Sequence, residues 1–247
     1  MLDASGVSMR VHVGTSGFAY KEWRGSFYPE KMKEKDMLRY YAERLGAVEI
    51  NNTFYRMPSS EMLLRWAEQV PDGFTFVLKA SQHITHRQRL SAGSAETVSV
   101  LFETARALGR RLGPLFFQTP PLLKRDTERL RAFLGFLPAD HKVAFEFRHE
   151  SWFDDEVYSA LRERNAALVA VDRDEAGDEG APLVPTADWG YVRLRRKDYD
   201  DRGLAAWREQ LLAQPWREAF VFFKHEEGAP LGWPAIERFA ASVAGAS

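Results

Sequence analysis

Short apolar runs alternate with amphipathic segments along the chain, and this alternation constrains the fold more than any other feature. Eight runs have the composition of buried strands: residues 11–13, 48–55, 74–80, 115–118, 143–147, 167–171, 191–194 and 220–223. Helix-like segments follow most of them, at residues 37–45, 59–70, 95–112, 126–137, 154–165, 204–212 and from 234 onward. Strands that alternate with helices at a repeat of roughly 30 residues are typical of βαβ units and of a parallel sheet.

Eight such units in 247 residues predict one domain over residues 1–247, folded as a (β/α)8 TIM-like barrel with room for one irregular unit. An open doubly wound sheet is the alternative architecture. No Gly-x-Gly-x-x-Gly pattern follows a strand and no Walker Gly-Lys-Ser/Thr pattern occurs, which disfavours that alternative. The acidic, glycine-containing stretch at residues 172–182 is interpreted as a connection between two strands and not as a linker between domains.

The chain has no cysteine, which excludes a disulfide scaffold, a thiolate zinc site, an iron–sulfur cluster and a cysteine nucleophile. With 34 Lys and Arg against 35 Asp and Glu, the net charge of −1 argues against an overall cationic nucleic-acid-binding protein but leaves a local basic cleft open. The N-terminal residues lack the basic-then-apolar build of a signal peptide, and no apolar run approaches the ~20 residues that span a bilayer. We therefore expect a soluble, cytoplasmic protein.

Polar side chains stand at the C-terminal ends of the predicted strands, where TIM barrels place their chemistry. Glu49, Asn51 and Thr53 follow one another at a spacing of two, so they are predicted to share one face of the second strand. Glu146 and Arg148 have the same spacing at the end of the fifth strand. An unpaired charge inside an apolar strand costs several kcal/mol, so these residues either form a structural ion-pair network across the barrel mouth or build a functional site.

The residue types at the strand ends fall into two predicted roles. Carboxylates and histidine can move protons, so the predicted catalytic residues are Glu49, Glu146 and His149. Cationic, amide and hydroxyl side chains can hold a polar or anionic substrate, so the predicted substrate-binding residues are Asn51, Thr53, Lys79, Gln118, Arg148 and Arg193. His83 and His86 are only a weak metal signal, and no metal ligand and no cofactor is predicted.

An aromatic cluster follows the first strand and consists of Phe18, Tyr20, Trp23, Phe27 and Tyr28. These rings would either wall a ligand pocket or form a core that closes one end of the barrel. The sequence leaves both interpretations open.

Five ordered motifs stand out in the first two thirds of the chain. They are 14–20 (GTSGFAY) with Trp23 and 27–29 (FYP); 48–55 (VEINNTFY); 79–80 (KA) with 84–86 (ITH) and 89–90 (RL); 112–114 (LGP) with Gln118 and 120–121 (PP); and 146–149 (EFRH) with 151–152 (SW). Together they resemble the domain-of-unknown-function 72 family, also called YecE-like. The resemblance implies a TIM-barrel-like fold, in agreement with the periodicity, and it implies no activity.

The last third of the chain departs from the pattern of that family. Members usually carry an Arg-x-His-Gly-like end to the seventh strand and an Asn-rich, Asp-containing end to the eighth. Here residues 193–196 read RLRR and residues 223–226 read FKHE. Arg195, Lys224 and Glu226 are therefore weaker site candidates than the residues of the matching motifs.

Three functions are compatible with these residues. The first is an enzyme that binds a polar or anionic small molecule through Lys79, Arg148 and Arg193, while Glu49 or Glu146 moves a proton. The second is a metal-dependent phosphodiesterase or nuclease, which rests on fold analogy alone and requires a metal among interleaved cations that would repel it. The third is a non-catalytic module that binds nucleic acid or a metabolite at the same cationic mouth. A membrane partner is not expected, and the oligomeric state is not predicted.

Overall fold

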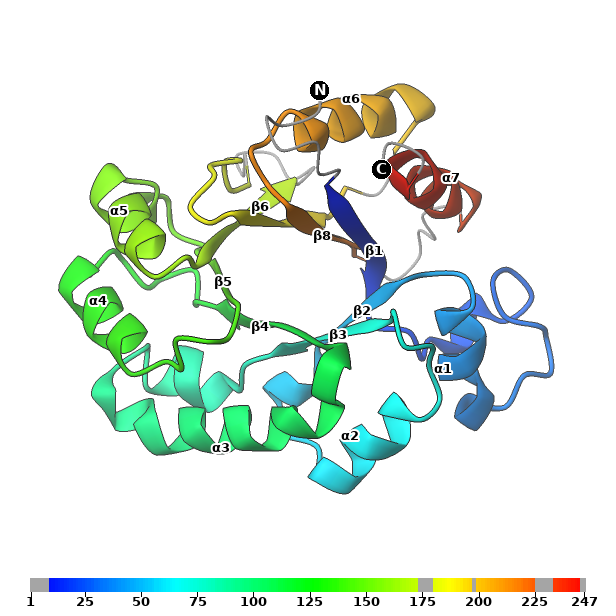
Figure 1. Cartoon of the computed structure of the whole chain (residues 1–247), viewed down its shortest axis with the longest axis horizontal. Coiled ribbons are helices and arrows are strands. Elements are labelled where there is room, and N and C mark those ends of the chain that lie inside the picture. The colour runs from blue at the N-terminus through cyan, green and yellow to red at the C-terminus, as the bar shows by residue number, and fades with distance from the viewer. Residues whose placement is uncertain (1–8, 173–179, 197–198, 225–232, 245–247) are drawn as a thin grey trace.

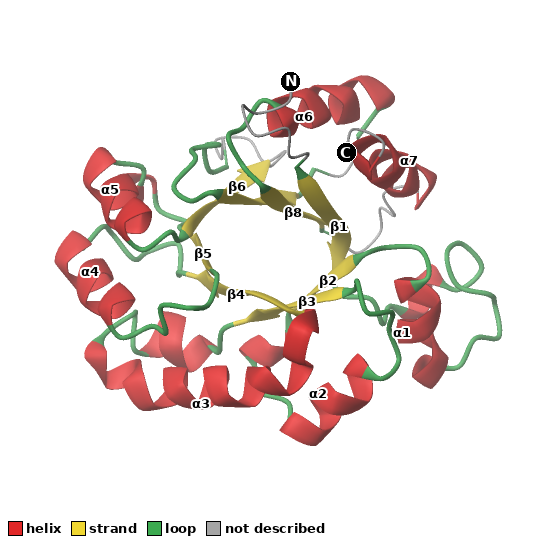
Figure 2. Ribbon diagram, viewed as in Figure 1, coloured by secondary structure: helices red, strands yellow, loops and turns green. Residues whose placement is uncertain are grey.

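Eight parallel strands form a closed barrel in the computed structural model, which describes residues 9–172, 180–196, 199–224 and 233–244 (Figure 1, Figure 2). Each strand pairs with the next one in the sequence, and β8 pairs with β1 to close the ring. The strands are β1 Arg10–Ser16, β2 Ala47–Ile50, β3 Thr75–Lys79, β4 Leu112–Gln118, β5 Val143–Glu146, β6 Ala167–Asp172, β7 Trp189–Leu194 and β8 Glu218–Phe223. The predicted TIM-like barrel is therefore confirmed.

Helices cover the outside of the ring of strands (Figure 2). They are α1 Glu34–Ala42, α2 Ser60–Ala67, α3 Ala95–Ala105, α4 Thr127–Gly135, α5 Asp155–Glu163, α6 Asp201–Leu212 and α7 Trp233–Ala244. Between β6 and β7, the described residues 180–188 contain no helix. Across the described ranges, no helix is both long enough and apolar enough to cross a membrane.

Helix starts follow the capping signals in the sequence. Ser59, Asp126 and Asp154 each accept a hydrogen bond from a backbone N–H of the first turn of α2, α4 and α5. Asp200 caps α6 in the same way, so that helix begins earlier than its apolar residues alone indicate.

Three predicted boundaries are wrong. The second strand ends at Ile50, and Asn52–Phe54 turns into a short 3-10 helix. The helix predicted over 95–112 ends at Ala105, because the following 3-10 segment Arg106–Arg111 contains Gly109 at φ 54°, a conformation that breaks a right-handed helix. Strand β4 therefore starts at Leu112, earlier than its apolar run suggested.

The barrel interior is filled with side chains. Phe116, Tyr191, Phe220 and Phe222 supply most of the bulk, and the rings of Phe116 and Tyr191 stack with their centroids 5.4 Å apart. A second, larger core lies between the strands and the surrounding helices. The packed interior means that a ligand can enter only at an end of the barrel.

The aromatic cluster after β1 belongs mainly to the core. Trp23, Phe27 and Tyr28 are buried, and Trp233 at the start of α7 packs against Trp23 and Phe27 with ring centroids 4.3 and 3.8 Å apart. The core interpretation is therefore correct for these rings, whereas Tyr20 also lines the pocket described below.

Candidate active site

A layer of polar residues lies at the C-terminal end of the barrel core. Each member comes two positions after a small or apolar residue that faces the inside of the barrel. Because side chains alternate along a strand, the polar residue points into the barrel too. The pairs are Gly14 and Ser16, Ala47 and Glu49, Val77 and Lys79, Phe116 and Gln118, Ala144 and Glu146, and Tyr191 and Arg193. The structure thus brings together five of the nine predicted site residues from five different strands.

Arg193 lies at the centre of this layer and binds both buried carboxylates. Its Nη2 atom is 2.9 Å from Oε1 of Glu49, and its Nη1 atom is 2.6 Å from Oε2 of Glu146. The side chains of Glu49 and Glu146 are fully buried, and that of Arg193 is 4% exposed. The guanidinium group also lies 4.9 Å from the centroid of the Phe116 ring, on the core side of the layer.

Glu49 is saturated with hydrogen bonds. Besides Arg193, its carboxylate accepts from Ser16 Oγ at 2.7 Å, Asn51 Nδ2 at 3.0 Å and Tyr191 Oη at 2.6 Å. Burial by itself raises the pKa of Glu49, but the charge of Arg193 and these donors outweigh it and hold the pKa below its ordinary value. Glu49 is therefore ionised at neutral pH.

Glu146 has a similar environment. Gln118 Nε2 donates to Glu146 Oε1 at 2.8 Å, and Arg195 Nη1 lies 3.8 Å from the same oxygen. Burial raises the pKa of Glu146, and the charges of Arg193 and Arg195 lower it more, to about 2. The proton-moving role of Glu49 and Glu146 stays a prediction, and two strongly ion-paired carboxylates of low pKa are weak bases for it.

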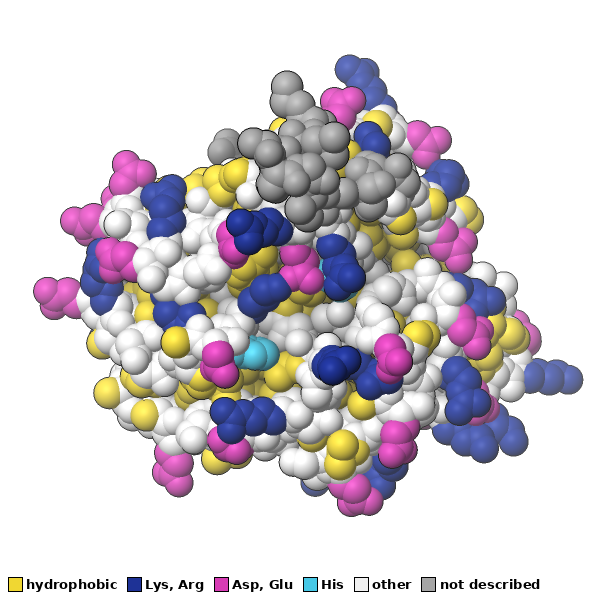
Figure 3. All heavy atoms as spheres, viewed as in Figure 1, with side chains coloured by type: hydrophobic (Ala, Val, Ile, Leu, Met, Phe, Trp, Pro, Cys, Tyr) yellow, Lys and Arg dark blue, Asp and Glu magenta, His cyan; other side chains and the backbone are white. Residues whose placement is uncertain are grey.

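A cavity of about 400 Å³ opens above this layer at the barrel mouth. Its described lining consists of Ser16, Tyr20, Asn51, Phe54, Tyr55, Lys79, His86, Gln118, Arg148, Arg193, Arg195 and Lys224. Lys and Arg side chains gather around the hollow at the centre of this face (Figure 3). The lining thus includes five cations and, among the described residues, no carboxylate, because Glu49 and Glu146 lie beneath it.

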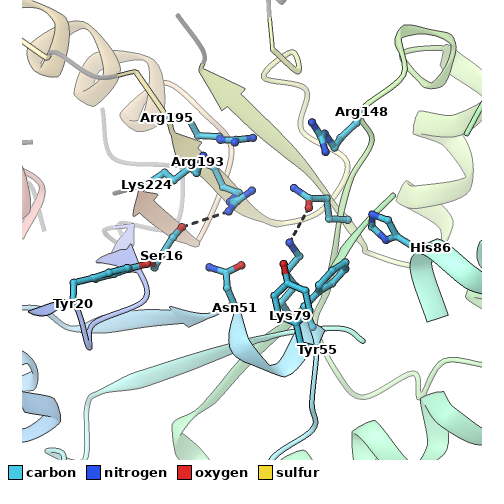
Figure 4. Close-up of a pocket in the computed structure, with 12 residues that line it drawn as sticks. Ser16, Tyr20, Asn51, Tyr55, Lys79, His86, Arg148, Arg193, Arg195 and Lys224 are labelled. Carbon is cyan, nitrogen blue, oxygen red and sulfur yellow. Dashed lines mark hydrogen bonds between the residues drawn. The ribbon is translucent and has the colours of Figure 1, made fainter. Parts of the chain in front are cut away.

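The cations reach the cavity from different strands (Figure 4). Arg193, Arg195 and Lys224 come from the β7 and β8 side, Lys79 stands beside Asn51 on the β2 and β3 side, and Arg148 points into the cavity from the end of β5. Lys79 Nζ donates to Gln118 Oε1 at 2.8 Å and lies 4.5 Å from the centroid of the Phe54 ring. Burial, and then the charge of Arg193, lower the pKa of Lys79 to about 8, although Glu49 and Glu146 act against this.

Two predicted residues lie elsewhere. Because the second strand ends at Ile50, Thr53 does not share the inward face with Glu49: it is buried, and its hydroxyl donates to the backbone oxygens of Lys79 at 2.6 Å and Ile50 at 3.0 Å. His149 is absent from the lining of the cavity, and its Nδ1 atom accepts from the backbone N–H of Ser151 as a helix cap. The structure thus gives Thr53 and His149 structural contacts, while the substrate-binding role of Thr53 and the catalytic role of His149 stay predictions.

Several lining residues were not predicted as site residues. Phe54, Tyr55 and His86 form an aromatic wall, in which Phe54 packs edge-on against both neighbours and Tyr55 is 74% exposed. Tyr191, which lies in the buried layer and not in the lining, was not predicted as a site residue either. Its position two residues before Arg193 would have placed it on the same inward face. Burial, then the charges of Lys79 and Arg148, lower the pKa of His86, so both cations act on this ring.

The model of the family described as "Protein of unknown function DUF72" matches residues 12–244. The chain belongs to the DUF72 family. The YunF protein (UPF0759) of Bacillus subtilis (strain 168) is 24% identical over 235 residues, which cover 90% of this chain and 81% of YunF. The YecE protein (UPF0759) of Escherichia coli (strain K12) is 32% identical over 117 residues, or 47% of this chain and 43% of YecE.

A solved DUF72 family structure has the same fold. The crystal structure of a DUF72 family protein from Thermotoga maritima MSB8 superposes with a TM-score of 0.83 at 26% identity, covering 95% of this chain and 99% of the other. The family resemblance of the sequence motifs and the fold that it implies are both confirmed.

The part of the chain that departs from the DUF72 pattern also contributes to the cavity. Arg193 and Arg195 at the end of β7 and Lys224 after β8 line it, so the weaker candidates Arg195 and Lys224 do belong to the mouth. His225 and Glu226 lie outside the described residues. Within the described part of the chain, no group of three or more His, Asp or Glu side chains is arranged to hold a metal ion.

Proposed function

We propose that this DUF72 protein is an enzyme that binds a small anionic molecule in the cavity at the barrel mouth. The observation that carries the proposal is the charge arrangement: Lys79 and Arg148 line the cavity, and neither forms an ion pair with a described carboxylate. A pocket of about 400 Å³ suits a metabolite-sized ligand.

The buried layer beneath the cavity supports this assignment. Glu49 and Glu146 pair with Arg193 and Arg195, so the charges of these four residues balance, and neither carboxylate forms an ion pair with Lys79 or Arg148. The two carboxylates also fix the Arg193 guanidinium by two short ion pairs, and a cation that is already oriented requires no reorganisation when an anion arrives. Arginine presents parallel N–H donors that match a carboxylate or phosphate group, which favours Arg148 as the main anion contact.

The position of the cavity favours an enzyme over a passive binding module. TIM-barrel enzymes place their active sites at the C-terminal ends of the strands, and the cavity lies there. Lys79 lines it, and its pKa of about 8 suits proton transfer or nucleophilic attack near neutral pH. Lys79 therefore takes the chemical role that the sequence assigned to the carboxylates.

Calorimetric titration with inorganic phosphate and with a panel of small mono- and dicarboxylates tests the binding. We expect at least one of these anions to bind saturably, and Arg148→Ala to weaken that binding by about tenfold or more, as loss of a charge-assisted contact requires. Arg110→Ala, which changes an exposed arginine of the segment before β4, is the matched control. Equal effects of the two variants, or no saturable binding, contradict the proposal.

A polyanion separates the enzyme from a nucleic-acid-binding module. If a single-stranded oligonucleotide binds more tightly than every small anion, and its affinity falls steeply with salt, the cationic mouth binds phosphate backbones instead. For an enzyme, we expect NMR to show that the bound anion is converted to a product. The Lys79→Arg variant should show no such conversion.

A further inference from the structure

The role of Lys79 reaches beyond anion binding, because its surroundings suit an uncharged amine. Its backbone is fixed at the end of β3: Thr53 Oγ1 donates to the carbonyl oxygen of Lys79 at 2.6 Å. Its side chain is held between Gln118 and the face of the Phe54 ring. The pKa of a lysine shifts readily when the side chain is buried, and this amine is half-buried and held in one position.

The hydrogen-bond partner of Lys79 is an amide and not a carboxylate. Both buried carboxylates are already bound to Arg193. The amide of Gln118 donates through Nε2 to Glu146, which turns its Oε1 atom toward Lys79. An amide oxygen can accept from a neutral amine as well as from an ammonium group, and it favours the charged form less than a carboxylate in the same place would.

We propose that Lys79 is a nucleophile that forms an imine with the carbonyl group of a bound 2-oxo acid. This inference rests on the proposed function, since the carboxylate of the 2-oxo acid is the anion that Arg148 would bind. A 2-oxo acid carries its electrophilic carbon next to its carboxylate, and Lys79 and Arg148 face the same cavity (Figure 4). Lysine amines in desolvated pockets next to another cation are activated for this reaction.

The step balances without an oxidant or reductant. The lone pair of Nζ attacks the carbonyl carbon, the C–N bond forms as the C=O double bond opens, and the oxygen takes a proton from solvent. The carbinolamine then loses water, which carries away the oxygen, the solvent proton and one amine proton. The iminium nitrogen keeps one N–H, for which Gln118 Oε1 is the acceptor, and its positive charge lies near the Phe54 ring.

Reductive trapping tests the inference on the full-length protein. The protein is incubated with pyruvate, glyoxylate or 2-oxoglutarate and sodium borohydride, and the product is read by intact mass and peptide mapping. We expect one reduced adduct, located on Lys79, that forms at least tenfold faster than adducts on other lysines and increases as the pH rises through about 8. Acetone, which has the carbonyl but no carboxylate, should give at least tenfold less adduct at the same concentration.

Three variants make the result decisive. Lys79→Arg keeps the charge and removes the amine, so it should abolish the adduct while saturable anion binding persists. Arg148→Ala should keep the amine and reduce the adduct at subsaturating 2-oxo acid. Lys142→Arg changes a lysine that pairs with Glu218 away from the mouth, and it should leave the adduct unchanged.

The possible failures are distinguishable. Anion binding that depends on Arg148 but is accompanied by no adduct on Lys79 overturns the imine inference and leaves the proposed function intact. Adducts spread over exposed lysines, and reduced as much by Lys142→Arg as by Lys79→Arg, overturn the inference as well. Absence of both anion binding and adduct overturns the proposed function together with the inference.

Discussion

The Nζ atom of Lys79 donates a 2.8 Å hydrogen bond to Oε1 of Gln118, and the same amide donates from Nε2 to Glu146, also at 2.8 Å. One neutral side chain therefore stands between a lysine and a buried carboxylate. A carboxylate in the position of Gln118 would be a direct counter-ion of Lys79 and would favour its charged form. The Gln118 amide thus lies between Lys79 and Glu146, and Glu146 is paired with Arg193.

Substitutions of Gln118 should move the pKa of Lys79 in opposite directions. Gln118→Glu places a negative charge beside Nζ and should raise the pKa above 8, and a rise of about one unit lowers the neutral amine fraction at neutral pH about tenfold. Gln118→Leu removes the acceptor and should lower the pKa further. Competitive acylation of Lys79 against pH, read by mass spectrometry, gives both midpoints. Gln210→Glu on the exposed face of α6 is the control, and identical midpoints in all variants would contradict the role of the amide.

Acid should destabilise the protein through Glu146. Its folded-state pKa of about 2 lies below the ordinary value of 4.5, so the ionised form contributes stability that is present above about pH 4.5 and is lost as the pH falls toward 2. In this window each such carboxylate steepens the fall in the free energy of unfolding by up to about 1.4 kcal/mol per pH unit. In Glu146→Gln, the free energy of unfolding should fall less steeply with decreasing pH, by the equivalent of about one bound proton. Urea unfolding at several pH values measures this slope.

The control for this experiment is Glu128→Gln, at an exposed position of α4. It should leave the slope of the parent protein unchanged. Glu49 also has a lowered pKa, so Glu146→Gln should retain part of the acid sensitivity. A slope that is the same in Glu146→Gln and in the parent protein would show that the ion pair with Arg193 does not govern the acid response.

The sequence predicted the inward-facing part of the site because that part follows strand periodicity. Glu49, Lys79, Glu146 and Arg193 are each two positions from a core residue, and the alternation of side chains is a local property that a single sequence reveals. The caps Ser59, Asp126 and Asp154 are local in the same sense, because a cap acts on the first turn of its own helix.

The remaining features depend on where strands end and on how the barrel closes. Thr53 was misplaced because the chain leaves the strand after Ile50, and the period of two no longer applies in the 3-10 turn that follows. His149 follows a strand end, where no periodicity fixes the direction of a side chain. The bond from Tyr191 to Glu49 joins residues 142 positions apart, and only the stagger of the closed barrel brings them together.

Tyr191→Phe should destabilise the protein although it changes a single oxygen atom. The hydroxyl of Tyr191 donates to Oε2 of the fully buried Glu49 at 2.6 Å, and its loss leaves that carboxylate oxygen without this donor. The expected decrease in the free energy of unfolding is about 1–3 kcal/mol, as measured by urea denaturation at neutral pH. Tyr158→Phe on α5 is the matched control and should have little effect. A decrease for Tyr191→Phe that is no larger than the control would contradict the importance of this bond.

Thr53 is predicted to position Lys79 through the backbone. Its hydroxyl donates to the carbonyl oxygen of Lys79 at 2.6 Å, which holds the end of β3 against the turn after β2. Thr53→Val has nearly the same shape but no donor, so it should cost about 1–3 kcal/mol in the free energy of unfolding. It should also move the acylation midpoint of Lys79 toward the ordinary value of 10.5, because the amine loses its fixed place between Gln118 and Phe54. Thr53→Ser keeps the hydroxyl and should restore the parent midpoint, whereas a Thr53→Val protein that is destabilised but keeps that midpoint would limit Thr53 to a structural role.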